Sequence, residues 1–460
     1  FRGVTPDSIP VADTVPGPGG GPATPDGFAV LCPDAAPYCT YFRPGAERNG
    51  VPVVVAADLT LWGFGIPGLS ARFSARAGGD LASVKVWPGT VPRLQLLEGY
   101  VEYRRAFAQA RVGRQITTSR LGYEGFDGGR LLLRDAARGL SLDGYLGWGL
   151  TRGVALPVTS PALNPLDDFQ PRQRQIVAGA GAGWTNRWFD VHGDYLREVD
   201  PSVDYFVSER AGVQAVVRPV RGVTVSGGSD WDLAMGLWGS ADVALGVARS
   251  RFSATVGARR YRPYFPLWTI WGAFSPVPYH ATFAQLSAHV GERVDLRARG
   301  ERYRYDPADV STQLVAVENR GWRWEIGGAA VLRNDLSANA GYQAEYGPGA
   351  SSAGLSGSLT YAPAGPWRLT LQGATLQRPL EFRFDESKVW SLGFTTRIDV
   401  ADQLHLDFGA DYYHEGRHRP DAATFDWNQL RLNARAVWLL GKSADLVGLP
   451  PAIHRPPSRD

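Results

Sequence analysis

The chain has 460 residues, of which 44% are hydrophobic and 20% are charged, and its formal net charge is only +3. This balance gives no sign of a polyanion-binding tail, so we expect no nucleic-acid partner. No run of about 18 apolar residues occurs, which excludes helical membrane spans. Glycine is abundant, and the 15 tryptophans far exceed the single methionine, a composition that favours strands and tight turns.

The N-terminal segment, residues 1–37, is rich in proline and glycine and has no sustained periodicity, so it is predicted to be a coil-like arm. The only two cysteines, Cys32 and Cys39, lie close together in this region. We expect them to form a local disulfide, which implies an oxidising compartment. Because no targeting segment precedes Phe1, we expect such a segment to be missing from the sequence and do not infer a cytoplasmic protein.

From about residue 51 to residue 439, segments of 10 to 15 residues alternate between apolar and polar side chains. In "LSANAGYQAEY" (336–346), for example, every second residue is apolar. Side chains two apart share one face of a strand, so these segments are two-faced strands. Short turns near residues 186, 219, 249, 292, 334, 365 and 401 alternate with longer loops at about 152–171, 260–279, 304–318, 377–388 and 414–426.

This pattern must be distinguished from that of a soluble sandwich or propeller. Sandwich strands average 5–6 residues, about half the length of these segments, and have scrambled connections. Segments of about 10 residues with alternating short and long connections are typical of outer-membrane barrels. We therefore predict an all-β fold: a single transmembrane antiparallel up-and-down β-barrel over residues 38–440, followed by a Pro-rich periplasmic tail at residues 441–460.

The number of strands follows from the position of the termini. About 21 segments are strand-like, but bacterial barrels usually have an even number of strands with both termini in the periplasm. "YCTYFRP" (38–44) is the candidate for the missing strand. The prediction is 22 strands, or 20 if two of the shorter segments are loops.

The segment "VGRQITTSRLGYEGFDGGRLLL" (112–133) breaks the alternation at Gly113. Strict alternation would point Arg114 into lipid, at a cost of about 2–4 kcal/mol near the midplane, whereas a bulge at Gly113 would turn it inward. Residues 113–115, residues 126–128 and Arg130 resemble the porin-like alginate-export barrel family. This resemblance implies that Arg114 and Arg130 face an anion pathway in the lumen, and we add Arg134 by alternation.

Charged residues elsewhere also fall on the face predicted to line the pore. In "VDLRARGERY" (294–303), four charges alternate with four small or apolar residues. If this strand pairs with "WRWEIGG" so that Arg299 meets Glu325 and Glu301 meets Arg323, the wall carries a ladder of opposite charges. The predicted pore-lining residues are Arg114, Arg130, Arg134, Asp295, Arg297, Arg299, Glu301, Arg323, Glu325, Glu345, Arg397, Asp407, Arg431 and Arg435.

Two motifs resemble sites of other kinds. "HEGRH" (414–418) has the zinc-peptidase spacing, but that chemistry needs a helix, and Gly416 and Pro420 argue for a loop. "GAGAGW" (179–184) is not followed by a helix and is better explained as a strand with alternating glycines. We therefore predict no catalytic residues, metal or cofactor.

The expected function is diffusion of small polar or charged solutes through a water-containing outer-membrane channel. Because only about 37 to 50 residues precede the strands, we expect no large plug domain. The alternative is a barrel that anchors or forms part of an envelope-spanning assembly for secretion, motility or electron transfer, with a periplasmic partner at the N-terminal arm or the C-terminal tail. Either function implies contact with outer-membrane lipid and lipopolysaccharide.

Overall fold

The computed structural model describes most of the chain, with gaps that lie mainly in the long connections. The described residues are 2–17, 21–33, 36–47, 49–62, 64–82, 84, 92–150, 174–202, 207–262, 264, 277–306, 319–347, 351–380, 386–418 and 427–440.

The structure is almost entirely β, as predicted. Among the described residues, the single helical element is a short 3-10 helix, η1 (Val11–Asp13), and no helix is long and apolar enough to cross a membrane. Five strands come first: β1 (Arg2–Pro10), β2 (Val15–Pro16), β3 (Pro22–Ala23), β4 (Val30–Leu31) and β5 (Tyr38–Glu47). The remaining strands are β6 (Pro52–Trp62), β7 (Leu69–Asp80), β8 (Leu94–Arg104), β9 (Ala108–Ser119), β10 (Gly122–Asp135), β11 (Leu140–Gly149), β12 (Ile176–Thr185), β13 (Phe189–Val199), β14 (Val207–Val217), β15 (Val223–Asp232), β16 (Leu237–Ala248), β17 (Phe252–Tyr261), β18 (Tyr279–Val290), β19 (Val294–Tyr305), β20 (Arg320–Arg333), β21 (Leu336–Tyr346), β22 (Ser351–Tyr361), β23 (Trp367–Leu380), β24 (Glu386–Ala401), β25 (Leu404–His418) and β26 (Trp427–Trp438).

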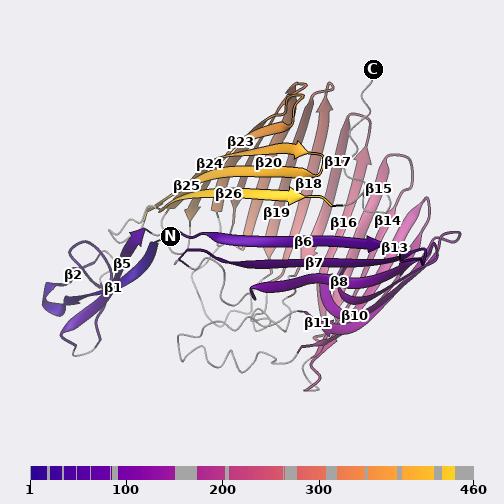
Figure 1. Cartoon of the computed structure of the whole chain (residues 1–460), viewed down its shortest axis with the longest axis horizontal. Helices are drawn as coiled ribbons and strands as arrows, with labels where there is room; N and C mark the ends of the chain where they lie inside the picture. The colour runs from indigo at the N-terminus through magenta and orange to yellow at the C-terminus, as the bar shows by residue number, and fades with distance from the viewer. Residues whose placement is uncertain are drawn as a thin grey trace.

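Strands β6–β26 form one closed barrel in which each strand pairs with its neighbours in sequence (Figure 1). Consecutive strands are antiparallel, as expected of chain segments joined by hairpins. Closure pairs the edges that an open sheet would expose to lipid. The predicted transmembrane up-and-down barrel is therefore the observed fold.

Connections differ between the two ends of the barrel. The connections after β6, β8, β10, β12, β14, β16, β18, β20, β22 and β24 have at most six residues each and share one end, which we call the short-turn end. The opposite, long-loop end holds the longest connections, residues 150–175 and 262–278, together with shorter ones such as β9–β10 and β15–β16. The predicted short turns are thus confirmed, but the long loops predicted at 377–388 and 414–426 are shorter than expected, because β23 extends to Leu380, β24 begins at Glu386 and β25 extends to His418.

The barrel has 21 strands, not 22 or 20. It closes with β26 beside β6, and because the number is odd these two strands run in the same direction (Figure 1). The chain consequently enters the barrel at the long-loop end and leaves it at the short-turn end. The prediction that both termini lie on the periplasmic side does not hold for the segments that flank the barrel directly.

The missing strand lies in a separate N-terminal sheet, which projects from the long-loop end (Figure 1). There β5, which contains the segment predicted as a barrel strand, pairs with β1 and β4. Residues 1–37 are therefore not only coil, because they include β1. This strand pairs with β5, which was predicted to pair within the barrel. The predicted disulfide is present, with Cys32 and Cys39 joined at an S–S distance of 1.99 Å.

The two faces of the barrel wall differ in chemistry as the alternation predicts. On β19, Leu296 is 48% exposed, and its neighbours across the pairings are small or apolar. The intervening position Glu301 is buried among charged partners. Large apolar side chains therefore face outward and charged side chains face the lumen, which is the arrangement of an outer-membrane barrel.

Candidate functional site: the lumen and its constriction

A charge ladder lines the inner wall at β19 and β20. The register places Arg299 opposite Glu325 and Glu301 opposite Arg323, which confirms the predicted pairing. The ion pairs themselves are partly shifted along the strand: Arg323 lies 3.0 Å and Arg299 lies 3.4 Å from Glu301. Arg259 on β17 approaches Glu301 to 2.7 Å, so three arginines share one buried carboxylate.

Similar pairs continue around the barrel. Arg130 binds Asp143 at 2.9 Å, and Arg397 binds Asp407 at 2.8 Å. By register, every predicted pore-lining residue except Arg114 lies on the inward face: Arg130, Arg134, Asp295, Arg297, Arg299, Glu301, Arg323, Glu325, Glu345, Arg397, Asp407, Arg431 and Arg435. Their part in solute passage stays a prediction.

Arg114 is the exception. The β9–β10 register runs through Gly113 without a shift, so no bulge turns the chain there, although Gly113 has φ 128°. Arg114 therefore lies on the outward face, opposite Asp127. It is stabilised in place by a 2.7 Å bond to Asp127 and a 2.9 Å bond to the Leu96 carbonyl oxygen, and Arg174 also binds Asp127. These contacts neutralise the guanidinium, which removes the need for an inward turn.

The tight turn between β9 and β10 bends into the lumen. The sequence pattern did not predict this bend. Its tip residue Arg120 donates a hydrogen bond to Asp242 on β16 at 2.7 Å and lies 3.8 Å from Asp230 on β15. Leu121 packs in a buried cluster with Val177 of β12 and Leu196 of β13. The β9–β10 hairpin therefore lies against the inner wall and narrows the lumen at the long-loop end.

Glycines on the inner wall leave room for this hairpin. A Cβ atom at Gly212 would lie 3.0 Å from Leu121 Cδ2, and one at Gly228 would lie 2.5 Å from Arg120 Nη1. At Gly179, in the glycine-alternating strand, a Cβ atom would overlap the ring of Tyr145, which packs beside the same cluster. Close approach explains glycine at these positions.

Arg210 on β14 holds the hairpin from the wall side. It donates a 2.7 Å hydrogen bond to the carbonyl oxygen of Leu121 and binds Glu124 at 3.2 Å. Its guanidinium also stacks on the ring of Tyr264, 3.7 Å from the centroid. The Tyr264 hydroxyl shares a 2.5 Å hydrogen bond with Ser208. Burial raises the pKa of Tyr264 to about 12, so the phenol is neutral at physiological pH.

Opposite charges draw the hairpin to the wall. The inward face of β15 and β16 carries Asp230, Asp232 and Asp242, and Arg120 reaches two of them, Asp230 and Asp242. A cavity of about 220 Å³ remains between the hairpin tip and β14–β17. The constriction is thus held by charge-assisted bonds at its edge, and side chains do not fill it completely.

The two motifs that resemble other sites lie in strands. The loop predicted for "HEGRH" is wrong, because the motif continues β25, whereas "GAGAGW" lies in β12 as predicted. In the described part of the chain, no group of three or more histidine, cysteine or acidic residues is arranged to hold a metal ion. The loops at 152–171 and 260–279, which the sequence suggested as pore-narrowing elements, fall largely outside the described residues.

Comparison with known proteins gives a match at the level of fold. No family model matches the chain, and no curated protein matches its sequence. A solved structure titled "Copper transporter OprC" has a TM-score of 0.52 at 12% identity, over 84% of this chain and 78% of that one. A ferric enterobactin receptor, PfeA, in complex with BCV-L6 has a TM-score of 0.54 at 12% identity, over 80% and 74%. The PfeA mutant R480A from Pseudomonas aeruginosa, in complex with enterobactin, scores 0.52 at 11% identity, over 79% and 75%. The chain therefore has the fold of outer-membrane β-barrel proteins.

Proposed function

We infer that the barrel is an outer-membrane channel through which small polar or charged solutes diffuse. The observation that carries this proposal is the exposure of inward-facing charges away from the hairpin. The Arg297 side chain is 67% exposed and that of Arg397 is 48% exposed, although both face the lumen. Charges at such positions require water around them, because an isolated charge in a dry interior is very costly.

The β9–β10 hairpin would then set the width of the path at the long-loop end. Acids and bases alternate on the remaining wall, as the Arg397–Asp407 and Arg297–Glu325 pairs illustrate. Paired charges largely cancel at a distance, so we expect weak selectivity between cations and anions. An arginine-dominated anion pathway of the kind implied by the alginate-export resemblance is not favoured by this wall.

Planar-bilayer recordings test the proposal. The purified barrel should give stable openings, with a reversal potential close to zero in a salt gradient. In a parallel liposome-swelling assay, permeation of uncharged sugars should fall with their size. Bilayers that stay silent, together with liposomes that do not swell, would contradict the channel function.

The alternative, an anchor or conduit subunit of an envelope assembly, is favoured by one observation. The N-terminal sheet exposes large apolar side chains, with Leu31 70% exposed, Tyr38 56% and Phe42 51%. Exposed apolar residues grouped on one small unit are typical of a binding surface. Mild solubilisation from native membranes would then yield a stable complex whose partner is lost on deletion of residues 1–47.

A further inference from the structure

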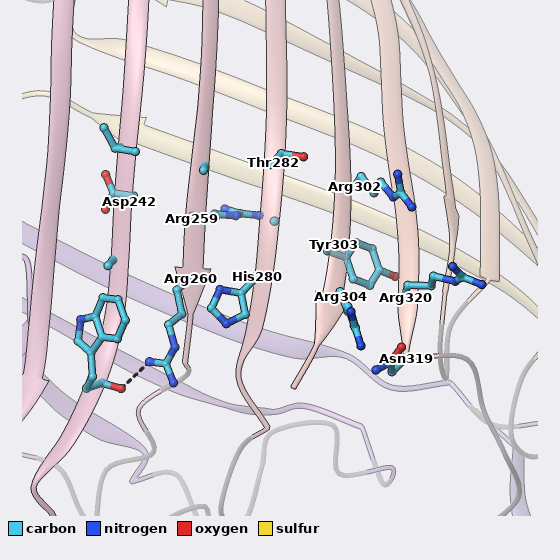
Figure 2. Close-up of a pocket in the computed structure, with 15 residues that line it drawn as sticks. Asp242, Arg259, Arg260, His280, Thr282, Arg302, Tyr303, Arg304, Asn319 and Arg320 are labelled. Carbon is cyan, nitrogen blue, oxygen red and sulfur yellow. Dashed lines mark hydrogen bonds between the residues drawn. The ribbon is translucent and has the colours of Figure 1, made fainter. Parts of the chain in front are cut away.

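A row of basic residues crosses the outer face of the barrel, on the side away from the lumen. Its members are paired directly across four adjacent strands, β17 to β20, close to the long-loop end. The row consists of Arg260, His280, Arg304 and Arg320, with Arg302 one step along β19. Figure 2 shows these side chains on neighbouring strands, near the point where the strands end.

The register establishes that the row faces outward. On β19, Arg302 and Arg304 share a face with Leu296. Glu301 and Tyr303 lie on the opposite face and are buried. On β20, Arg320 shares a face with Trp322 and Ile326, which are 45% and 51% exposed. The basic row therefore continues the apolar outer surface towards the long-loop end, next to an interfacial tryptophan.

Direct pairing of bases is unfavourable unless an anion joins them. Like charges opposite one another destabilise a sheet. Elsewhere on the outer face, bases meet acids: Arg114 lies opposite Asp127, and Arg197 lies opposite Glu209. In the row, by contrast, His280 lies opposite Arg304, and Arg304 lies opposite Arg320.

The described residues neutralise only part of this charge. Asp306 lies 3.1 Å from His280 and 3.9 Å from Arg260. Arg302 and Arg304 are exposed and, within the described part of the chain, form no ion pair. Arg302 and Arg304 therefore give the row excess positive charge, and their exposed guanidinium groups are suited to bidentate recognition of phosphate.

One member of the row is already fixed in position. Arg260 donates hydrogen bonds to the carbonyl oxygens of Trp238 and Gly239 at 2.6 and 2.7 Å, and its guanidinium lies over the Trp238 ring at 4.9 Å (Figure 2). The groove that contains the row has a volume of about 930 Å³. Neighbouring strands lie about 4.8 Å apart, so four strands span roughly 14 Å, more than a single phosphate needs.

We propose that this row binds the headgroup of a phosphorylated glycolipid of the outer leaflet, with more than one phosphate spread across β17–β20. The long loops of outer-membrane barrels are extracellular, so the row lies at the level of the outer-leaflet headgroups. The apolar surface beside it, including Leu286 and Leu296, would contact the acyl chains. This site is separate from the lumen, and its occupation does not depend on solute passage.

Lipid titration of the delipidated full-length protein in uncharged detergent, followed by native mass spectrometry, tests the proposal. The probes are lipid A with both phosphates, the same lipid A without phosphates, and inorganic phosphate. We expect the bisphosphorylated lipid to bind about tenfold or more tightly than the dephosphorylated one, a difference of at least about 1.4 kcal/mol. Inorganic phosphate should not displace it.

Two double variants on one strand supply the decisive comparison. R302Q/R304Q removes two outward charges and should weaken binding of bisphosphorylated lipid A by about tenfold or more. R297Q/R299Q removes the same charge from the inward face of β19 and should leave lipid binding unchanged, with folding of both checked by heat-modifiable gel mobility. Equal binding of dephosphorylated lipid, displacement by inorganic phosphate, or equal loss in both variants would each overturn the proposal.

Discussion

Arg120 and Asp242 are joined by a 2.7 Å hydrogen bond although six strand pairings separate β10 from β16 around the barrel. This contact holds the β9–β10 hairpin against the wall at β16. The width of the lumen at the long-loop end therefore depends on a few polar contacts at the hairpin tip, and these contacts can be removed one at a time.

Replacing Arg120 with alanine should release the hairpin tip. The change removes a charge-assisted bond worth about 1–3 kcal/mol and leaves Asp230 and Asp242 without their cation. We expect larger or more variable single-channel conductance in planar bilayers. Arg138→Ala is the matched control, because Arg138 lies at the short-turn end with its side chain 79% exposed. Identical conductance in wild type and R120A would show that the hairpin does not limit the path.

A wedge at Gly212 should displace the same hairpin from the wall side. In Gly212→Val, the added side chain would occupy the space of Leu121, which lies 3.0 Å from the Cβ position. Overpacking of this kind costs about 1–3 kcal/mol. Gly193→Val is the control, because the nearest atom to its Cβ position is 3.8 Å away. Proteolysis after Arg120 should become faster in G212V alone, and equal rates would argue against the packing described.

Neutralising Glu301 should destabilise the barrel strongly. Glu301→Gln leaves Arg259, Arg299 and Arg323 facing one another without their shared carboxylate. Loss of one partner from a buried ion network costs about 3–5 kcal/mol. The Glu325 side chain is 40% exposed and has one arginine as its partner, 3.2 Å away. Glu325→Gln should therefore lower the free energy of unfolding by about 1 kcal/mol or less. Urea unfolding in lipid vesicles measures both free energies.

Tyr264 should titrate much later than an exposed tyrosine. Burial raises its pKa to about 12 in the folded state, against an ordinary value of 10.0. Because the folded state favours the neutral phenol, its contribution to stability is complete below about pH 10 and is lost as the pH rises towards 12. The phenolate absorbance of wild type minus that of Tyr264→Phe should show one late transition. A difference curve centred near pH 10 would contradict the burial of this ring.

Removing the disulfide should loosen the N-terminal sheet and leave the barrel intact. Cys32 and Cys39 enclose a short loop, for which cross-linking stabilises the folded state by about 2–3 kcal/mol. In Cys32→Ser/Cys39→Ser, limited proteolysis should cut within residues 1–47 faster than in the wild type. The melting temperature of the barrel should not change, and a lower value would show that the two units stabilise each other.

The sequence by itself determined the fold class and the side on which most charges lie. Alternation has a period of two residues, so the local sequence of each strand shows which side chains share a face. On β19, for example, Leu296 lies on the outward face and Glu301 on the inward face. Loop lengths identified the two ends, and hairpin connections determined the pairing of Arg299 with Glu325. These features depend on neighbours in the chain, which a sequence pattern records directly.

Only the tertiary structure decided how the barrel closes, what narrows it, and which outward charges meet. Whether β5 pairs with β26 or with β1 is a competition between distant partners, and the N-terminal sheet prevailed. Arg114 stays outward because Asp127 neutralises it and the Leu96 carbonyl oxygen accepts a hydrogen bond from it, contacts that alternation cannot reveal. Arg120 meets Asp242 because of the curvature and register of several strands together. Such contacts are long-range, so their energies appear only when the whole wall is assembled.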